Sequence, residues 1–362
     1  LNMTAEETAE MRDRVHELGG VMSDEGVKAA AQFEDSLQDL KTAFSGIKRS
    51  LAGEFLPGVT KAMDGFTEIL IGNTDEGIAA IKEGRMAGTI AQQPALIGST
   101  AVTNALKLIN GETIEKSIPV EVTLVTIDNV ETFAELEEAT AVVGDGSIGL
   151  AVSTQNNPFF VSLVEGAEKQ AAALGVQITV ADAGDDAAKQ ASDIEDLVAS
   201  GISVLIVNPV DSDAVTGAVD FAKSKGVKVI AVDRAVNGTE IECQIASDNV
   251  LGAELATQFI VDTLGEGAVV AELEGVTGAS AAIDRSQGFH NIADSKLEVV
   301  ARQTANFARA EGMSVMENML QANPDIQGVF AANDEMAVGA MEAISGAGKN
   351  VMVVGFDATD DA

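Results

Sequence analysis

The chain has 362 residues, 46% of them hydrophobic, so it can bury more than one core, and two or three domains are expected. Acidic residues number 57 against 22 basic ones, and the resulting net charge of −35 disfavours nucleic acid and anionic lipid as partners. Cys243 is the single cysteine, which excludes an intramolecular disulfide and disfavours a thiolate metal site. No apolar run reaches the length of a membrane span, and residues 1–4 lack the basic and apolar regions of a signal peptide.

Residues 1–76 carry a helical pattern without a strand signal. Amphipathic stretches cover 5–18 and about 24–51, and Pro57 with Gly58 separates them from a further stretch over 59–70. The segment contains seven basic and fifteen acidic residues. We therefore predict an acidic, all-helical arm.

Residues 86–126 contain a strand, a helix and a second strand, which we predict over 86–92, 94–108 and 120–126. The helix ends near Gly111. The stretch 127–147 is rich in Glu, Ala and Gly and has no strong period, so it reads as a linker. About twenty flexible residues span roughly 25 Å on average.

From residue 148 onward, short apolar runs alternate with helical segments. This alternation predicts parallel sheets with right-handed crossovers, and its repetition after residue 249 predicts two similar lobes. The first set of strands is expected over 148–153, 176–181, 204–208 and 227–233, with helices over 159–174, 187–199 and 213–225. The second set is expected over 268–274, 298–303, 328–332 and 351–356.

Polar and aromatic residues follow the first of these strands. Ser153, Asn157, Phe159 and Phe160 stand at the carboxyl edge of a parallel strand, where such sheets bind ligands. Two successive Phe at a helix start point about 100° apart, so they cannot both face one core. They can offer ring faces to sugar C–H groups while Asn157 forms a hydrogen bond. The alternative is ordinary core packing with an Asn-Pro turn.

Charged residues recur at the ends of later strands. Asp233 and Arg234 follow 227–232, Asn333 and Asp334 follow 328–332, and Asp357 follows 351–356. A carboxylate accepts from two neighbouring hydroxyls and a guanidinium donates through a planar fork, so this set suits a polyol. A single Asp-Arg pair would be read as a surface ion pair, but its recurrence at one edge favours a binding crevice.

Three further residues are ambiguous when each is taken alone. Arg285 opens a helix and could be solvated, whereas Phe307 could belong to a core. Gln92 closes the strand over 86–92 and would point toward the junction between the lobes.

At these positions the sequence resembles the ribose-binding proteins of bacterial ABC sugar importers. The last residues, 356–362, stop within a motif of that family, and its continuation stands at 78–84. Read from 148 to 362 and then from 78 to 126, the sequence is similar to one uninterrupted protein, so it resembles a circular permutant. The positions 245–249 match the family's first hinge crossing. Ile283 and Ser286 depart from the family, where Arg and Gly are common.

The resemblance implies an α/β fold of the type I periplasmic-binding-protein class, with two Rossmann-like lobes that close on a ligand around a hinge. It implies one lobe from 93–121 with 148–247, and another from 248–362 with 78–92 and 122–126. It also implies D-ribose or a related monosaccharide as ligand, an ABC-importer permease as partner, a periplasmic or extracellular location, and no cofactor, metal or catalysis. The ligand-binding residues it implies are Ser153, Asn157, Phe159, Phe160, Asp233, Arg234, Arg285, Phe307, Asn333, Asp357 and Gln92.

Three other functions are a transcription regulator, an enzyme and a structural phage component. A sugar-sensing regulator of the lac-repressor type needs a basic helix-turn-helix, and an acidic arm does not hold phosphates. An enzyme needs a nucleophile-base pair or metal cluster at a strand end, and the sequence shows none. Residues 1–76 resemble a fragment of a phage tail tape-measure protein, which leaves a structural role with an appended sugar-binding fold.

Overall fold

The computed structural model describes residues 76–130 and 146–358. The predicted arm over 1–76, apart from its last residue, most of the linker and the last four residues of the chain lie outside the described residues. Within the described part, no helix is both long and apolar enough to cross a lipid bilayer.

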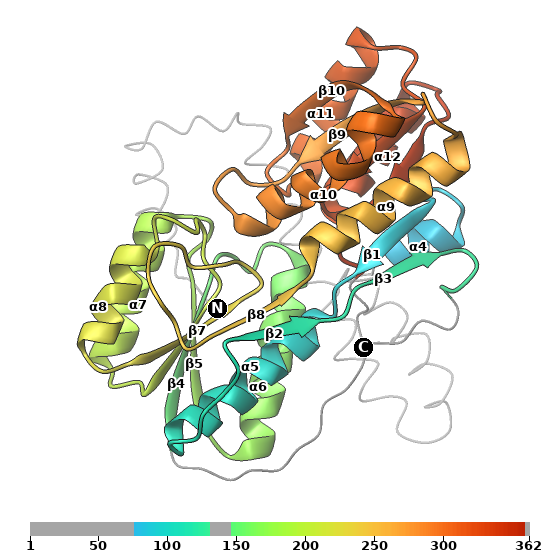
Figure 1. The fold of residues 1–362 in the computed structure, drawn as a ribbon. Coiled ribbons are helices and arrows are strands. Elements are labelled where there is room, and N and C mark those ends of the chain that lie inside the picture. Colours follow the sequence, from blue (N-terminus) through green and yellow to red (C-terminus); the bar gives the residue numbers. More distant parts are fainter. Residues whose placement is uncertain (1–75, 131–145, 359–362) are drawn as a thin grey trace, which may run out of the picture. The chain divides into compact units, whose positions relative to one another are not determined.

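The described chain forms two six-stranded sheets with helices on their faces (Figure 1). One sheet has the order β2-β8-β7-β6-β4-β5, and all of its neighbouring strands are parallel. Its strands are β2 (Ser117–Val120), β4 (Ser147–Val152), β5 (Gln177–Asp182), β6 (Val204–Val207), β7 (Lys228–Val232) and β8 (Cys243–Ser247).

Helices cover both faces of this sheet. Alternate residues of a strand point to opposite faces, and the strand residues accordingly divide between two hydrophobic clusters. One cluster packs under α5 (Pro94–Ile109) and α6 (Pro158–Leu174), and the other under α7 (Ala187–Ala199) and α8 (Thr216–Ser224). A Cβ on Gly98 would lie 2.0 Å from the carbonyl oxygen of Leu163, so the lack of a side chain allows α5 and α6 to approach closely.

The second sheet has the order β10-β9-β11-β12-β1-β3, and only β3 within it runs antiparallel, against β1. Helices α9 and α10 pack together, as do α11 and α12. The strands are β1 (Gly88–Ala91), β3 (Thr123–Thr126), β9 (Val269–Glu274), β10 (Glu298–Thr304), β11 (Gly328–Ala331) and β12 (Met352–Val354). The helices are α4 (Glu76–Lys82), α9 (Asn249–Leu264), α10 (Ser280–Lys296), α11 (Arg309–Ala322) and α12 (Asp334–Gly346).

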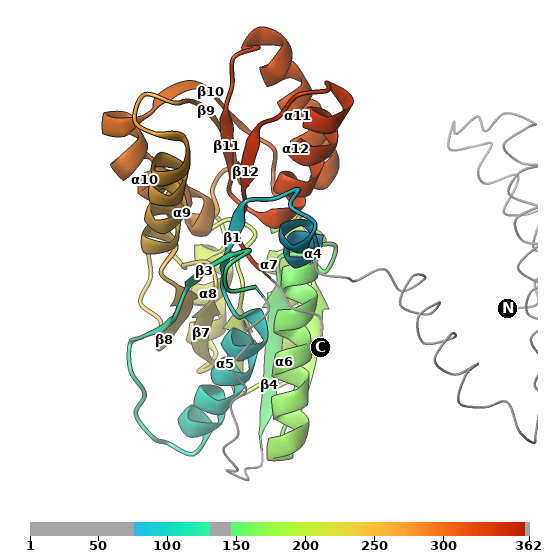
Figure 2. The same cartoon turned by 90° about the vertical axis from the view of Figure 1, so that its right-hand side faces the viewer.

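The predicted fold class of two parallel-sheet α/β lobes is confirmed, with one wrong strand. The strand predicted over 120–126 is wrong in its extent: Val120 ends β2, which pairs with β8 in one sheet, and 123–126 form β3, which pairs with β1 in the other. The chain therefore passes between the sheets at Glu121 and Val122. It does so again between β1 and α5, and between β8 and α9 (Figure 2). Strand β8 was not predicted.

Segments from the two ends of the sequence share one sheet. Strand β1 runs parallel to β12, with Gly88 opposite Val354, and the pairing continues as a bridge between Ala91 and Asp357. The circular order that the family resemblance implies places 86–92 beside 351–356, and this pairing is confirmed. The same order implies that Ala362 lies near Ile78, but Ala362 is outside the described part.

Candidate functional site

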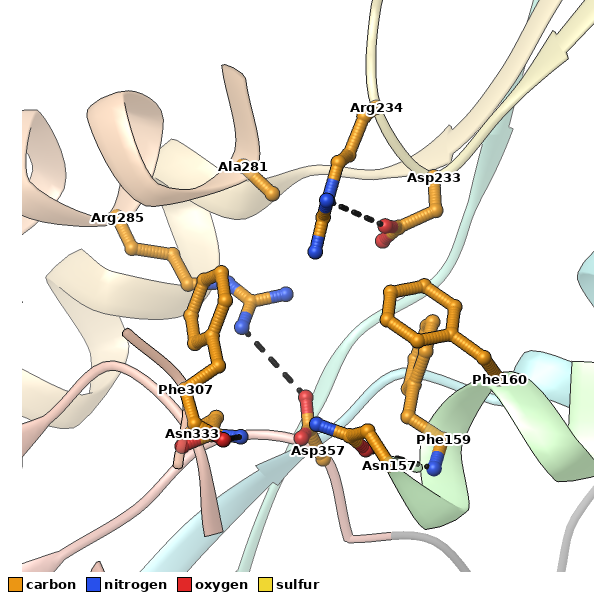
Figure 3. Close-up of a pocket in the computed structure, with 10 residues that line it drawn as sticks. All are labelled: Asn157, Phe159, Phe160, Asp233, Arg234, Ala281, Arg285, Phe307, Asn333 and Asp357. Carbon is orange, nitrogen blue, oxygen red and sulfur yellow. Dashed lines mark hydrogen bonds and ion pairs between the residues drawn. The ribbon is translucent and has the colours of Figure 1, made fainter. Parts of the chain in front are cut away.

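A pocket lies where the carboxyl ends of strands from both sheets meet. Its cavity volume is about 20 Å³, so the lining side chains stand close to one another. Five lining residues follow strands of the first sheet and five belong to the second (Figure 3). The lining residues are Asn157, Phe159, Phe160, Asp233 and Arg234 from the first, and Ala281, Arg285, Phe307, Asn333 and Asp357 from the second.

Nine of the eleven residues predicted for the site line this pocket, and the other two lie behind its wall. Ser153 and Gln92 are fully buried. Ala281 lines the pocket without having been predicted, because a methyl group carries no chemical signal in a sequence.

Aromatic rings form opposite walls of the pocket. Phe307 lies on one side and Phe159 and Phe160 lie on the other (Figure 3). The two adjacent Phe rings meet edge to face, with centroids 5.1 Å apart and an interplanar angle of 87°. This arrangement lets both rings contribute to the wall.

Two buried arginines reach the pocket from different lobes. The Arg234 Nη1 donates to the carbonyl oxygens of Pro209 at 3.0 Å and Val210 at 3.3 Å. In Arg285, Nε donates to Asn249 Oδ1 at 2.9 Å and Nη1 donates to the carbonyl of Ala332 at 2.6 Å.

Rings also hold both guanidiniums in place. Arg285 lies 4.0 Å from the ring centroid of Phe356, and Arg234 lies 5.1 Å from that of Phe160. Among the described residues the Nη2 groups of the two arginines have no hydrogen-bond partner, so each retains donors for a ligand.

The two carboxylates stand beside these arginines. Asp233 Oδ2 lies 3.7 Å from Arg234 Nε and accepts from Asn208 Nδ2 at 3.1 Å. Asp357 Oδ1 lies 3.5 Å from Arg285 Nη1 and accepts from Gln92 Nε2 at 2.6 Å. Each carboxylate therefore has an oxygen that can still accept from a ligand hydroxyl.

Helix capping fixes the two lining amides. Asn157 caps α6, where its Oδ1 accepts from the backbone N–H of Phe159 at 2.9 Å. Asn333 caps α12 in the same way, through the N–H of Met336 at 2.9 Å. Because the amide oxygens are occupied by capping, donors remain on the amide nitrogens. The Nδ2 of Asn333 also donates to the carbonyl oxygen of Phe307 at 3.3 Å, which leaves one of its two N–H groups.

A layer of polar groups lies behind the lining residues. Asn208 bridges the backbone N–H of Ser153 at 3.1 Å and the carboxylate of Asp233, and sequence reasoning missed it. Its position at the end of β6 was the available signal. Ser153 Oγ and Gln92 Oε1 are buried without a hydrogen-bond partner in the described structure. Such groups are normally satisfied, so they mark capacity for a further contact or a water.

The backbone is strained where it aims three of these side chains. Asp233, Phe307 and Asp357 have φ values of 59°, 58° and 138°, in the region that L-residues with side chains rarely adopt. Strain of this kind costs about 1–3 kcal/mol per residue and tends to cluster at functional sites.

Burial controls the protonation of the charged residues. Loss of water raises the pKa of Asp233 and lowers that of Arg234, and their mutual attraction opposes both shifts. Burial also raises the pKa of Asp357 well above its ordinary value, although Arg285 acts against this shift. Two positive and two negative groups thus face one small pocket, and each is desolvated. The described residues contain no group of three His, Cys, Asp or Glu placed to hold a metal ion.

The chain is similar to known proteins of one family. Residues 148–362 match the family model described as periplasmic binding protein domain. The chain is 55% identical over 216 residues to the ribose import binding protein RbsB of Bacillus subtilis (strain 168), covering 60% of this chain and 71% of that protein. It is 47% identical to the ribose import binding protein RbsB of Escherichia coli (strain K12), covering 66% and 81%.

A solved structure supports the same fold. The Caulobacter myo-inositol binding protein, bound to myo-inositol, superposes with a TM-score of 0.57 at 33% identity. The superposition covers 61% of this chain and 78% of that protein.

Proposed function

Because the chain belongs to the periplasmic binding protein domain family, we propose that it binds D-ribose or a related monosaccharide reversibly and delivers it to the permease of an ABC importer. The observation that carries this proposal is the pocket itself. Two arginines, two aspartates and two helix-capping asparagines converge between facing aromatic walls. The arginines and asparagines retain donors, and the aspartates retain acceptors, for a ligand.

A monosaccharide matches this chemistry on each count. Its hydroxyls can accept from Arg234 and Arg285 and donate to Asp233 and Asp357. Its C–H faces can lie against Phe307. The pocket's near-neutral charge suits an uncharged ligand better than a phosphate or carboxylate, since each aspartate would repel an anion.

The proposed mechanism is closure of two lobes on the sugar. One lobe comprises 93–121 and 148–247, and the other comprises 248–362, 78–92 and 122–126. A sugar that contacts both lobes stabilises only the closed arrangement, so binding shifts the population toward it. No chemical step is proposed, and the protein acts as a carrier in the periplasm or at the extracellular surface.

We also propose that the chain order is a circular permutation of the family order. The parallel pairing of β1 with β12 supports it, because β1 supplies the next strand after the C-terminal one. The residues 1–76, which resemble a tape-measure fragment, would then be an appended segment that the sugar site does not need.

Calorimetric titration tests the function directly. D-ribose should bind with 1:1 stoichiometry and no turnover, and D-xylose, D-galactose, D-allose and myo-inositol should bind more weakly. The ligand assignment fails if ribose gives neither heat nor a thermal shift while another of these compounds does.

The permutation has its own test. A rearranged protein in which 78–126 directly follow 362 should bind ribose within about threefold of the original. A protein from which 78–126 are deleted should lose binding, because it lacks Gln92 and β1. Loss of binding in the rearranged protein, if it still folds, would reject the proposed order.

A further inference from the structure

The buried carboxylate of Asp334, which does not line the pocket, accepts a hydrogen bond from the backbone beside Asp357. Asp334 is the first residue of α12, directly after Asn333, and it is 8% exposed. Its Oδ1 accepts from the hydroxyl of Thr89 at 2.7 Å, and its Oδ2 accepts from the backbone N–H of Ala358 at 3.0 Å. The backbone of Phe356 lies near this carboxylate and acts to lower its pKa.

These contacts hold the chain on both sides of Asp357. The N–H of Ala358, the residue after it, donates to the carboxylate of Asp334, and the backbone of Phe356, the residue before it, lies near that carboxylate. Asp357 has φ 138° and Ala358 has φ 45°, both in the strained region. Strained backbone persists only where the surroundings fix it by several contacts.

The sequence leaves space for this carboxylate. A Cβ on Gly355 would lie 2.1 Å from Asp334 Oδ1, so no side chain is compatible with Asp334 in this position. Thr89, the third contact, is fully buried and belongs to β1. One carboxylate therefore joins β1 to the end of the chain.

The same region positions Asp357 through β1. The N–H of Asp357 donates to the carbonyl of Ile90 at 2.7 Å, and the N–H of Gln92 donates to the carbonyl of Asp357 at 2.9 Å. A shift of β1 relative to the chain end would therefore move both Asp357 and Gln92.

We propose that Asp334 is a positioning residue for sugar binding: by fastening Thr89 and the backbone around Asp357, it holds the Asp357 carboxylate in the pocket wall and Gln92 behind it. This inference rests on the proposed binding function. Asp334 itself does not line the pocket, so its effect is transmitted through Asp357.

The charge of Asp334 should make sugar binding depend on pH in a way that a purely structural role of this residue would not. Burial raises the pKa of Asp334 to about 6, while its hydrogen bond to Thr89 opposes that shift. The negative charge of Asp334 in turn raises the pKa of Asp357. The charged groups that face Asp334 are Asp357 at the end of β12, Arg285 on α10 and Glu335 on its own helix.

Two substitutions test the proposal, with ribose affinity measured by titration from pH 5 to pH 8. Asp334→Asn should weaken binding about tenfold at pH 8. Thr89 and Ala358 donate to two different oxygens of Asp334, and the amide of Asn offers only one acceptor oxygen. It should also shift the loss of binding toward lower pH, because Asp357 then ionises more easily. Thr89→Val should weaken binding about threefold. Without the hydroxyl of Thr89 the pKa of Asp334 rises further, so the loss of affinity that accompanies protonation of Asp334 should move toward higher pH. Thr89→Ser keeps the hydroxyl and should retain the original affinity and pH profile.

The control is Asp325→Asn, which removes an exposed carboxylate from the same lobe and should leave both affinity and profile unchanged. The proposal is overturned if both substitutions lower the melting temperature but leave the affinity and pH profile of the folded protein as they were. If the unaltered protein does not bind ribose at all, the proposed binding function is rejected. That result is distinct from the result that rejects only the role of Asp334.

Discussion

The hydroxyl oxygen of Ser212 accepts a hydrogen bond from the backbone N–H of Ser280 at 3.2 Å, although the two residues belong to different lobes. A second hydrogen bond joins the same two lobes, in which the hydroxyl oxygen of Ser280 accepts from the backbone N–H of Ala235 at 2.7 Å. The N–H of Ser212 also donates to the carbonyl of Gly278 at 3.1 Å. These bonds exist only when the lobes are together, so they favour the closed form without touching a sugar.

Replacement of Ser280 by Ala should therefore weaken ribose binding about threefold to tenfold, since one hydrogen bond contributes roughly 0.5–1.5 kcal/mol. The change should appear as faster dissociation in stopped-flow measurements, with little change in association. Ser314→Ala, which removes an exposed hydroxyl bonded within α11, is the control. An unchanged dissociation rate would show that the serines do not stabilise closure.

Removal of a carboxylate from the pocket should cost more. Asp233→Ala leaves Arg234 and Asn208 without their buried partner, and we expect a loss of about 2–5 kcal/mol in ribose binding by calorimetry. Asp196→Ala, on the exposed side of α7 in the same lobe, should have no effect. Unchanged ribose affinity in Asp233→Ala would reject the assignment of this site.

The aromatic wall should contribute through contact and charge together. Phe307 lies 5.7 Å from Arg234 and 5.6 Å from Arg285, measured from each guanidinium carbon to the ring centroid. We expect Phe307→Ala to weaken ribose binding by about 2 kcal/mol, and Phe307→Leu by less, because Leu keeps some of the apolar area. Phe221→Ala, remote from the pocket on α8, should leave the affinity unchanged. Equal losses for Leu and Ala would indicate that the ring itself matters rather than its area.

The stability of the sugar-free protein should fall as the pH rises from about 4. Burial raises the pKa values of Asp233 and Asp357 and brings that of Asp334 to about 6, so the folded state holds protons that the unfolded state has released. Their contribution is fully present below the unfolded pKa, near 3.8, and is lost as the pH passes the raised folded values. Sugar binding should show the opposite trend, because it uses the ionised carboxylates.

Thermal unfolding with and without ribose, from pH 4.5 to pH 8, measures both trends. The net charge of −35 also destabilises the protein at high pH, so the series is repeated in about 1 M NaCl, where the Debye length is about 3 Å. Buried groups are screened least, and the fall should persist in salt. Disappearance of the fall in salt would assign it to surface repulsion.

Removal of residues 1–76 should leave ribose affinity within about threefold, because neither sheet takes a strand from them. Calorimetry on the truncated protein provides the measurement. A truncated protein that folds but no longer binds would show that the arm is part of the site.

The sequence by itself determined the lobes and most of the pocket. Alternating strands and helices require parallel sheets, and parallel strands bring their carboxyl ends to one edge. Residues such as Asp233 and Asp357 could therefore be assigned to a common crevice from their places after apolar runs. The pairing of β1 with β12 followed from the family order in the same way.

Only the tertiary structure decided which groups stand behind that crevice and which strands form on either side of the crossing at 121–122. The division of 120–126 into β2 and β3 depends on the neighbours that each half finds, since one apolar run suits either sheet. The roles of Asn208, Asp334 and Ser280 depend on contacts between residues distant in sequence, such as the 245 positions that separate Asp334 from Thr89. A local pattern cannot specify such partners, because a buried hydrogen bond is formed only after the elements have packed.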